Sequence, residues 1–190
     1  MLIYTSITNF FRKKDYMRKI TVFLLLISLV SLQIFSQEVT MKITSSAFNN
    51  GAAIPSIYSC KGDDISPPLH WEGEPKGTVS FALICDDPDA PMGTWVHWVY
   101  YNIPSSIHDL PQAFETDREP SAGGVQGMTS FRRTGYGGPC PPSGTHRYFF
   151  KIYALDSTVN LKKNAGKTEL VKAMKEHILA EAELWGIFDH

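Results

Sequence analysis

The side chains best suited to chemistry lie in two neighbouring segments of this 190-residue chain. The first, Cys85-Asp86-Asp87-Pro88-Asp89-Ala90-Pro91, holds three carboxylates and two prolines, and the second, Trp95-Val96-His97-Trp98-Val99, carries one imidazole. Proline fixes its own φ and restricts the residue before it, so the connecting loop has few conformations. Because such a loop has little entropy to lose, it can hold carboxylates at hydrogen-bonding distance from an imidazole. The pattern predicts a polar site.

A second candidate segment, residues 135–148, is rich in glycine and proline. Glycine allows close approach of the backbone to a ligand, proline stiffens the loop, and His146 stands just before an expected strand. The segment lacks the Gly-Lys-Ser/Thr of a nucleotide-binding P-loop. Its N–H groups can form an anion-binding nest, and a tight crossover between sheets explains the same composition equally well.

The elements that position these segments are mainly short strands. Alternating or continuous apolar patterns predict strands at 39–45, 57–61, 79–85, 95–102 and 147–155, with a stiff extended segment at 66–71. The run from Val79 to Cys85 is apolar on nearly both faces, which is typical of a central strand covered on two sides.

One helix is expected at the C-terminal end of the chain. Thr168 can cap it, Gly186 can stop it after Trp185, and apolar residues recur at three-to-four spacing: Leu170, Val171, Met174, Ile178, Leu179 and Ala182. Many short strands with one terminal amphipathic helix predict a mainly β protein, a β-sandwich with an appended α-helix.

The first 36 residues are expected to be a secretory signal peptide. Five basic residues precede the apolar run Ile20 to Val30, and cleavage is expected after Ser36, leaving one domain over 37–190. The alternative, a membrane anchor, falls short of the roughly 20 apolar residues a span needs. Met17 is a more natural initiator than Met1. The expected location is periplasmic or secreted.

Loss of residues 1–36 removes five basic residues and Asp15, so the net charge falls from −1 to −5. An acidic protein of this kind is not expected to bind nucleic acid. Three cysteines remain, Cys60, Cys85 and Cys140, with no Cys-x-x-Cys motif. An oxidising compartment allows one disulfide and one free thiol, and the sequence does not give the pairing. Cys85, among apolar neighbours, is interpreted as a buried hydrophobic residue.

Several motifs together resemble those of the phosphatidylethanolamine-binding proteins, also called Raf kinase inhibitor proteins. The two signature regions are matched by Asp86 to Pro91 with Trp95 to Trp98, and by Gly138 to Tyr148. Similarity to the bacterial, YbhB/YbcL-type branch comes from Tyr58-Ser59-Cys60, Ser66-Pro67-Pro68-Leu69 and Ala173 to Ala180. The resemblance runs from about Met41 to the end of the chain.

The resemblance implies antiparallel sheets, a β-sandwich of the family type, with a shallow anion pocket at one end. It assigns ligand binding to Asp87, His97, Gly137, Gly138, Pro139, His146 and Tyr148. Pro88, Asp89 and Pro91 would brace the loop. No cofactor and no metal ion are expected. Inhibition of a kinase or protease and a homodimer are expectations taken from relatives.

The function expected from these residues is binding of phosphate or of a phosphorylated head group of the phosphoethanolamine type, without catalysis. His97 and His146 would donate to phosphate oxygens, and Asp87 would either accept a hydrogen bond from a ligand ammonium group or hold His97 as an imidazolium. The alternative is a hydrolase that uses the same Asp/His/His cluster for acid–base catalysis. No nucleophile motif such as Gly-x-Ser-x-Gly supports it.

Overall fold

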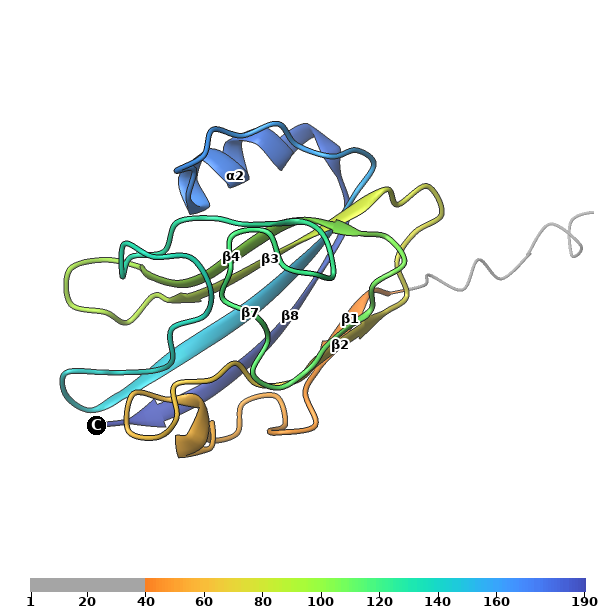
Figure 1. Ribbon diagram of the computed structural model, residues 1–190. Helices are drawn as coiled ribbons and strands as arrows, with labels where there is room; N and C mark the ends of the chain where they lie inside the picture. Colours follow the sequence, from red (N-terminus) through yellow and green to blue (C-terminus); the bar gives the residue numbers. More distant parts are fainter. Residues whose placement is uncertain (1–39) are drawn as a thin grey trace, which may run out of the picture. The chain divides into compact units, whose positions relative to one another are not determined.

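The computed structural model describes residues 40–190, which form two antiparallel sheets and a short helix (Figure 1). The smaller sheet has the order β1-β2-β5, and the larger has the order β6-β4-β3-β7-β8. The strands are β1 (Lys42–Thr44), β2 (Leu69–Glu72), β3 (Ser80–Asp87), β4 (Trp95–Pro104), β5 (Asp109–Leu110), β6 (Val125–Gln126), β7 (Thr145–Leu155) and β8 (Ile178–Asp189). Helix α2 spans Lys167–Met174, and 3₁₀ turns occupy Ser56–Tyr58 and Lys175–His177. The predicted mainly β, antiparallel architecture is confirmed.

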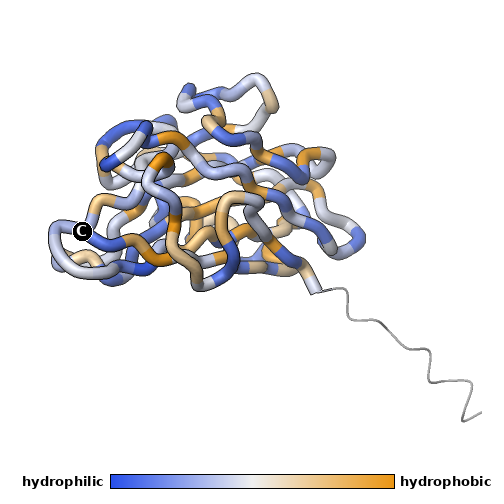
Figure 2. Tube along the Cα trace, turned by 90° about the horizontal axis from the view of Figure 1, so that it is seen from below, coloured by the Kyte–Doolittle hydropathy of each residue, from blue (hydrophilic) through white to orange (hydrophobic). Residues whose placement is uncertain are grey.

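The larger sheet is covered on both faces. One face packs on the smaller sheet through a core that includes Trp71, Phe81, Leu83, Trp98 and Phe150. The opposite face packs under α2 through a second core: Ala82, Ile84, Val99, Tyr101, Leu155, Val159, Leu170 and Met174. Figure 2 shows the hydrophobic positions running along the strands and the hydrophilic ones in the peripheral loops. Every residue of β3 is buried, as expected for a central strand.

The tail of the chain corrects one prediction. The helix expected over 168–185 ends at Met174, and after one 3₁₀ turn the chain becomes β8, paired in register with β7 from Ile178 to Asp189. Residues 180–183 alternate between alanine and glutamate before Leu184, which is a strand period. Pairing with the long strand β7 satisfies the backbone N–H and C=O groups of this segment, and this outweighs the helical spacing of its apolar residues.

The strand expected at 57–61 is also wrong. The 3₁₀ turn Ser56–Tyr58 follows Pro55, and the turn continues because the Ser59 hydroxyl donates to the Ser56 carbonyl. Cys60 forms a disulfide with Cys140, so this segment is tied to the loop before β7 and not to a sheet.

Two connections meet at one end of the larger sheet. Since β3, β4 and β7 are antiparallel neighbours, the end of β3 lies beside the starts of β4 and β7. The β3–β4 loop and the segment before β7 therefore meet there, at the left in Figure 1. The predicted signal peptide, residues 1–36, lies outside the described residues. None of the helices within 40–190 is long and apolar enough to cross a bilayer.

Candidate functional site

The last residue of β3 carries the acidic group of the site. Asp87 is buried, and its Oδ2 accepts a hydrogen bond from His146 Nδ1 at 2.7 Å, while its Oδ1 accepts the Asp89 N–H at 2.8 Å. His146 comes from the start of β7, so the pair links two strands across the end of the sheet. A carboxylate with both oxygens engaged has a fixed orientation.

His97 lies in a β-bulge at the start of β4. The register of β3 with β4 shifts between Cys85 and Asp86, which leaves His97 between the paired positions Val96 and Trp98. Its Nδ1 donates to the Gly137 carbonyl at 2.6 Å, and its own carbonyl accepts the Gly137 N–H at 3.0 Å. Its ring meets Tyr148 and Phe131 edge-on, with centroids 5.1 and 5.3 Å apart.

The electrostatics of His97 correct the expected Asp87–His97 imidazolium pair. Burial is the largest effect and lowers the pKa of His97 below its usual 6.5, although the Gly137 carbonyl and the nearby Asp87 charge oppose it. Asp87 makes its hydrogen bond to His146 instead. A buried imidazole without a charged hydrogen-bond partner favours the neutral form.

The glycine-rich loop lies behind His97. A Cβ on Gly137 would come within 2.5 Å of the Phe131 ring, so only glycine allows the loop to approach so closely. The Gly138 N–H donates to Asp64 Oδ1 at 2.6 Å, and the Pro139 carbonyl accepts the Cys60 N–H at 3.1 Å. The Cys60–Cys140 disulfide links the same two segments covalently. These bonds fix the carbonyl that holds His97.

A cavity of about 330 Å³ opens between these elements. Its walls combine three of the predicted ligand-binding residues with largely apolar neighbours: Asp87, Ala90, Pro91, Met92, Trp95, His97, Phe131, Cys140, Pro142 and Tyr148. The Tyr148 hydroxyl is buried and donates to no acceptor among the described residues, while the backbone of Cys140 lies near it. Burial raises the pKa of Tyr148, so its hydroxyl stays protonated and can donate.

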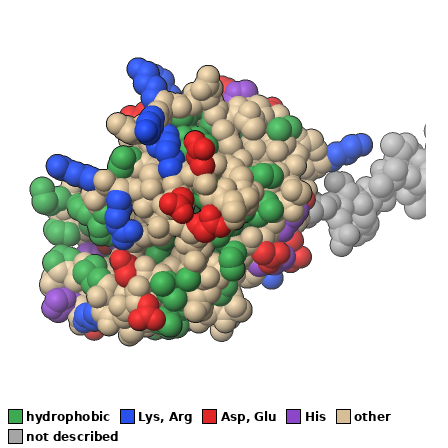
Figure 3. Space-filling model, viewed as in Figure 1, with side chains coloured by type: hydrophobic (Ala, Val, Ile, Leu, Met, Phe, Trp, Pro, Cys, Tyr) green, Lys and Arg blue, Asp and Glu red, His purple; other side chains and the backbone are tan. Residues whose placement is uncertain are grey.

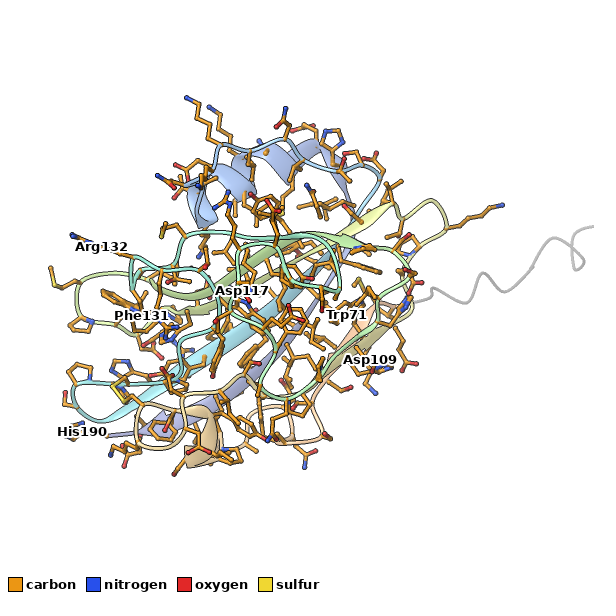
Figure 4. All side chains as sticks on the ribbon, viewed as in Figure 1. Trp71, Asp109, Asp117, Phe131, Arg132 and His190 are labelled. Atoms are coloured by element: carbon orange, nitrogen blue, oxygen red, sulfur yellow. A yellow bond between two sulfur atoms is a disulfide. The ribbon has the colours of Figure 1, made fainter. Side chains whose placement is uncertain are left out.

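The apolar rim of this cavity was not predicted as part of the site. Met92 is 95% exposed and Trp95 is 38% exposed. Hydrophobic side chains gather at the left edge of Figure 3, at the end of the molecule where the β3–β4 loop lies. Figure 4 places Phe131 at this end and Trp71 at the opposite end. The only sequence signal for Trp95 was its place beside His97 in the motif.

His146 and residues 137–139 are near the cavity without lining it. His146 reaches it through Asp87, and Gly137 through His97. Asp89 forms a two-point ion pair with Arg147, at 2.9 Å to Nε and 2.7 Å to Nη2, and also accepts the Arg147 N–H. Hydrogen bonding to Arg147 lowers the pKa of Asp89 to about 2. The loop carrying Pro88 and Pro91 is thereby anchored to β7.

Asp86 belongs to the other face of the sheet. It is buried and is paired with Lys151 at 3.1 Å and with Lys167 at the start of α2. This pairing attaches the helix to the sheet, and Asp86 does not line the cavity. Within residues 40–190, no group of three or more His, Cys, Asp or Glu side chains is arranged to hold a metal ion.

Comparison with known proteins agrees with this fold. A family model described as phosphatidylethanolamine-binding protein matches residues 44–189. The chain is 47% identical over 148 residues to a UPF0098 protein of Methanothermobacter thermautotrophicus, which covers 78% of this chain and 98% of that protein. It is 45% identical over 165 residues to a UPF0098 protein of Aquifex aeolicus, covering 84% and 95% of the two chains.

Two solved structures share the architecture. The phosphatidylethanolamine-binding protein homolog CT736 of Chlamydia trachomatis matches with a TM-score of 0.74 and 38% identity, covering 80% of this chain and 99% of that one. Escherichia coli YbcL, described as a new member of the mammalian PEBP family, matches with a TM-score of 0.73 and 33% identity, covering 79% and 98%. The chain belongs to the phosphatidylethanolamine-binding protein family.

Proposed function

We propose that this protein is a binding protein for phosphate or for phosphorylated head groups of the phosphoethanolamine type, held in the cavity at the end of β3, β4 and β7. The observation that carries the proposal is the Tyr148 hydroxyl, a buried donor without a partner that adjoins a cavity also lined by Asp87 and His97. Buried polar groups are nearly always hydrogen-bonded, so an unpaired one in a cavity suits a ligand oxygen. Gly137 and His146 would act by holding His97 and Asp87.

An NMR titration of the histidine ring signals with phosphoethanolamine and with inorganic phosphate tests this proposal. We expect saturable shifts at His97 and His146, and unchanged signals from His177, which pairs with Asp156 on the surface. Asp87→Asn and His97→Ala should each abolish the shifts. Histidine signals that stay constant up to high ligand concentration at pH 6 would contradict the proposal.

An oxidising location, periplasmic or secreted, is part of the proposal. The Cys60–Cys140 disulfide supports it, because structural disulfides persist in oxidising compartments. Residues 1–36 have the composition of a signal peptide. N-terminal sequencing of the protein from a cell envelope fraction would find a start near Gln37 if cleavage follows Ser36. A regulatory role toward a kinase or protease, and a homodimer, stay predictions from the resemblance.

The Asp87–His146 pair also resembles an acid–base dyad, which is the observation in favour of a hydrolase. Among residues 40–190, however, the cavity walls contain no serine or threonine, and their one cysteine, Cys140, is in a disulfide. A covalent mechanism would therefore lack an ordinary nucleophile. Release of inorganic phosphate from phosphoethanolamine, lost in Asp87→Asn, would favour the hydrolase over the binding protein.

A further inference from the structure

The cavity offers an unusual set of groups to an anion. Of the polar groups in its walls, Asp87 can only accept a hydrogen bond when ionised, while Tyr148 has one O–H donor and Trp95 has one indole N–H donor. No lysine or arginine is among the described residues that line it. A phosphate dianion would lie beside the Asp87 carboxylate there with no cationic side chain in the described walls, which is a poor match for two negative charges.

The hydrogen bond to Gly137 decides what His97 contributes. A carbonyl can only accept, so Nδ1 of His97 carries a hydrogen in either charge state. In the neutral ring Nε2 is then a bare acceptor, because Nδ1 carries the hydrogen that bonds the Gly137 carbonyl. In the charged ring Nε2 would be a donor. Because the 2.6 Å bond keeps a hydrogen on Nδ1, the addition or loss of one proton takes place at Nε2. This proton decides whether Nε2 donates or accepts a hydrogen bond.

The charged groups around His97 do not supply this proton. Asp87 and Asp86 come from β3, and His146 from β7 donates to Asp87. Arg133 pairs with Asp64, and Arg147 pairs with Asp89. His97 itself is 3% exposed, and burial holds it toward the neutral state. A ligand that brings a proton avoids the cost of charging this ring.

We propose, on the basis of the phosphate site above, that the cavity selects phosphate monoesters and binds them together with one proton, shared between a phosphate oxygen and His97 Nε2. The Tyr148 hydroxyl donates to a second phosphate oxygen. A phosphate monoester has a second pKa of about 6, so near neutral pH it readily provides this proton. A phosphodiester has no such proton, and His97 must be charged to receive it.

Isothermal titration calorimetry on the purified protein tests the inference with two ligands that carry the same amine. These are phosphoethanolamine, a monoester, and glycerophosphoethanolamine, a diester. Titration at pH 8 in two buffers of different ionisation enthalpy gives the number of protons taken up. We expect uptake close to one proton per monoester bound, and affinity that falls by nearly tenfold for each pH unit above about 6.5. At pH 6 the monoester should bind about tenfold more tightly than the diester.

Variants locate the proton. His97→Asn keeps an amide donor for the Gly137 carbonyl and removes Nε2, so uptake should fall below half of the wild-type value. Tyr148→Phe should weaken binding and leave proton uptake unchanged. His70→Asn, at an exposed histidine paired with Asp109, is the matched control and should change neither quantity.

The outcomes separate this inference from the function on which it rests. Binding of the monoester without proton uptake, or equal affinity for the diester at pH 6, would overturn the inference and leave the phosphate site standing. Uptake of a full proton that persists in His97→Asn would place the proton elsewhere and overturn it as well. Absence of binding by both ligands at pH 6 would sink the proposed function together with the inference.

Discussion

Asp87 Oδ2 lies 2.7 Å from His146 Nδ1, and the two residues are 59 positions apart in the chain. Both side chains are buried, and they join the end of β3 to the start of β7. Asp87 also accepts the Asp89 N–H through its other oxygen. This carboxylate therefore organises the β3–β4 loop and the imidazole of β7 together, while His97 is held separately by a backbone carbonyl.

A double-mutant cycle on Asp87 and His146 should reveal this coupling. Asp87→Asn removes the charge and one of two acceptor oxygens, and His146→Phe removes the donor, so each should lower the free energy of unfolding by about 1–3 kcal/mol. The double variant should lose less than the sum, with an interaction energy of about 1–3 kcal/mol. Urea denaturation at pH 7 measures all four proteins.

A parallel cycle on Asp87 and His97 is the control for that experiment. These two side chains make no hydrogen bond to each other, so their interaction energy should be clearly smaller than that of the Asp87–His146 cycle. Equal interaction energies in the two cycles would contradict the pairing in the structure and would favour the Asp87–His97 pair expected from the sequence.

The central strands could be predicted from the sequence because their side-chain patterns are local. The apolar run at 79–85 and the aromatic run at 95–102 became β3 and β4, each with ends within two residues of the prediction. The tail was mispredicted because residues 168–185 satisfy the helical period as well as the strand period. Only the long partner strand β7 decides between them, and that contact is not local.

The same limit applies to the site. The sequence brought Asp87, His97, His146 and Tyr148 into one region, and the structure places all four there. It could not show which histidine Asp87 holds, because that depends on the bulge between Cys85 and Asp86 and on the β3–β7 register. Phe131 enters from a long connection whose packing against Gly137 leaves no periodic signal.

Tyr148→Phe should weaken ligand binding without lowering the stability of the protein. The hydroxyl is buried without a partner, so its removal should leave the free energy of unfolding unchanged or raise it by up to about 1 kcal/mol. Phosphoethanolamine affinity should fall about tenfold or more, since a hydrogen bond to a charged group is lost. Thermal denaturation and calorimetric titration of the same sample measure both effects. A marked loss of stability would show that the hydroxyl is already satisfied within the protein.

The protonation of His97 makes acid pH destabilising. Its pKa in the folded protein is lowered from 6.5 by burial, so below pH 6.5 the unfolded chain takes up a proton that the folded protein resists. Stability from this residue is present above pH 6.5 and is lost as the pH falls toward its folded pKa. The difference in free energy of unfolding between wild type and His97→Asn should therefore shrink from pH 7.5 to pH 5. A difference that grows on acidification would mean that His97 is charged in the folded state.

Gly137→Ala should distort the cavity because its added methyl group would collide with the Phe131 ring. The added Cβ would lie 2.5 Å from that ring, so the ring or the loop must move. We expect a loss of about 1–3 kcal/mol in stability, as in other overpacked sites, and a shifted His97 ring signal. Gly144→Ala is the control, because its Cβ meets open space and its left-handed φ of 64° adds backbone strain only. It should leave the His97 signal in place, and an identical shift in both variants would refute the contact.

Reduction of the Cys60–Cys140 disulfide should lower the stability of the whole domain but leave the structure of the cavity largely unchanged. The bond links residues 80 apart, and its loss should lower stability by about 2–5 kcal/mol, seen as a melting temperature reduced by about 5–15 °C. The loop should keep its place at room temperature, because Gly138 still bonds Asp64 and Tyr136 still bonds the Tyr58 carbonyl.

Two variants complete the disulfide experiment. The double change of Cys60 and Cys140 to alanine should melt at the lowered temperature with or without reductant. Cys85→Ala removes the buried free thiol and should respond to reductant by the same shift as wild type, because Cys85 takes no part in the bond. Phosphoethanolamine binding should survive reduction because the bonds from Gly138 and Tyr136 still fix the Gly137 carbonyl. Loss of binding on reduction, with the fold retained by circular dichroism, would instead make the disulfide a condition of the site.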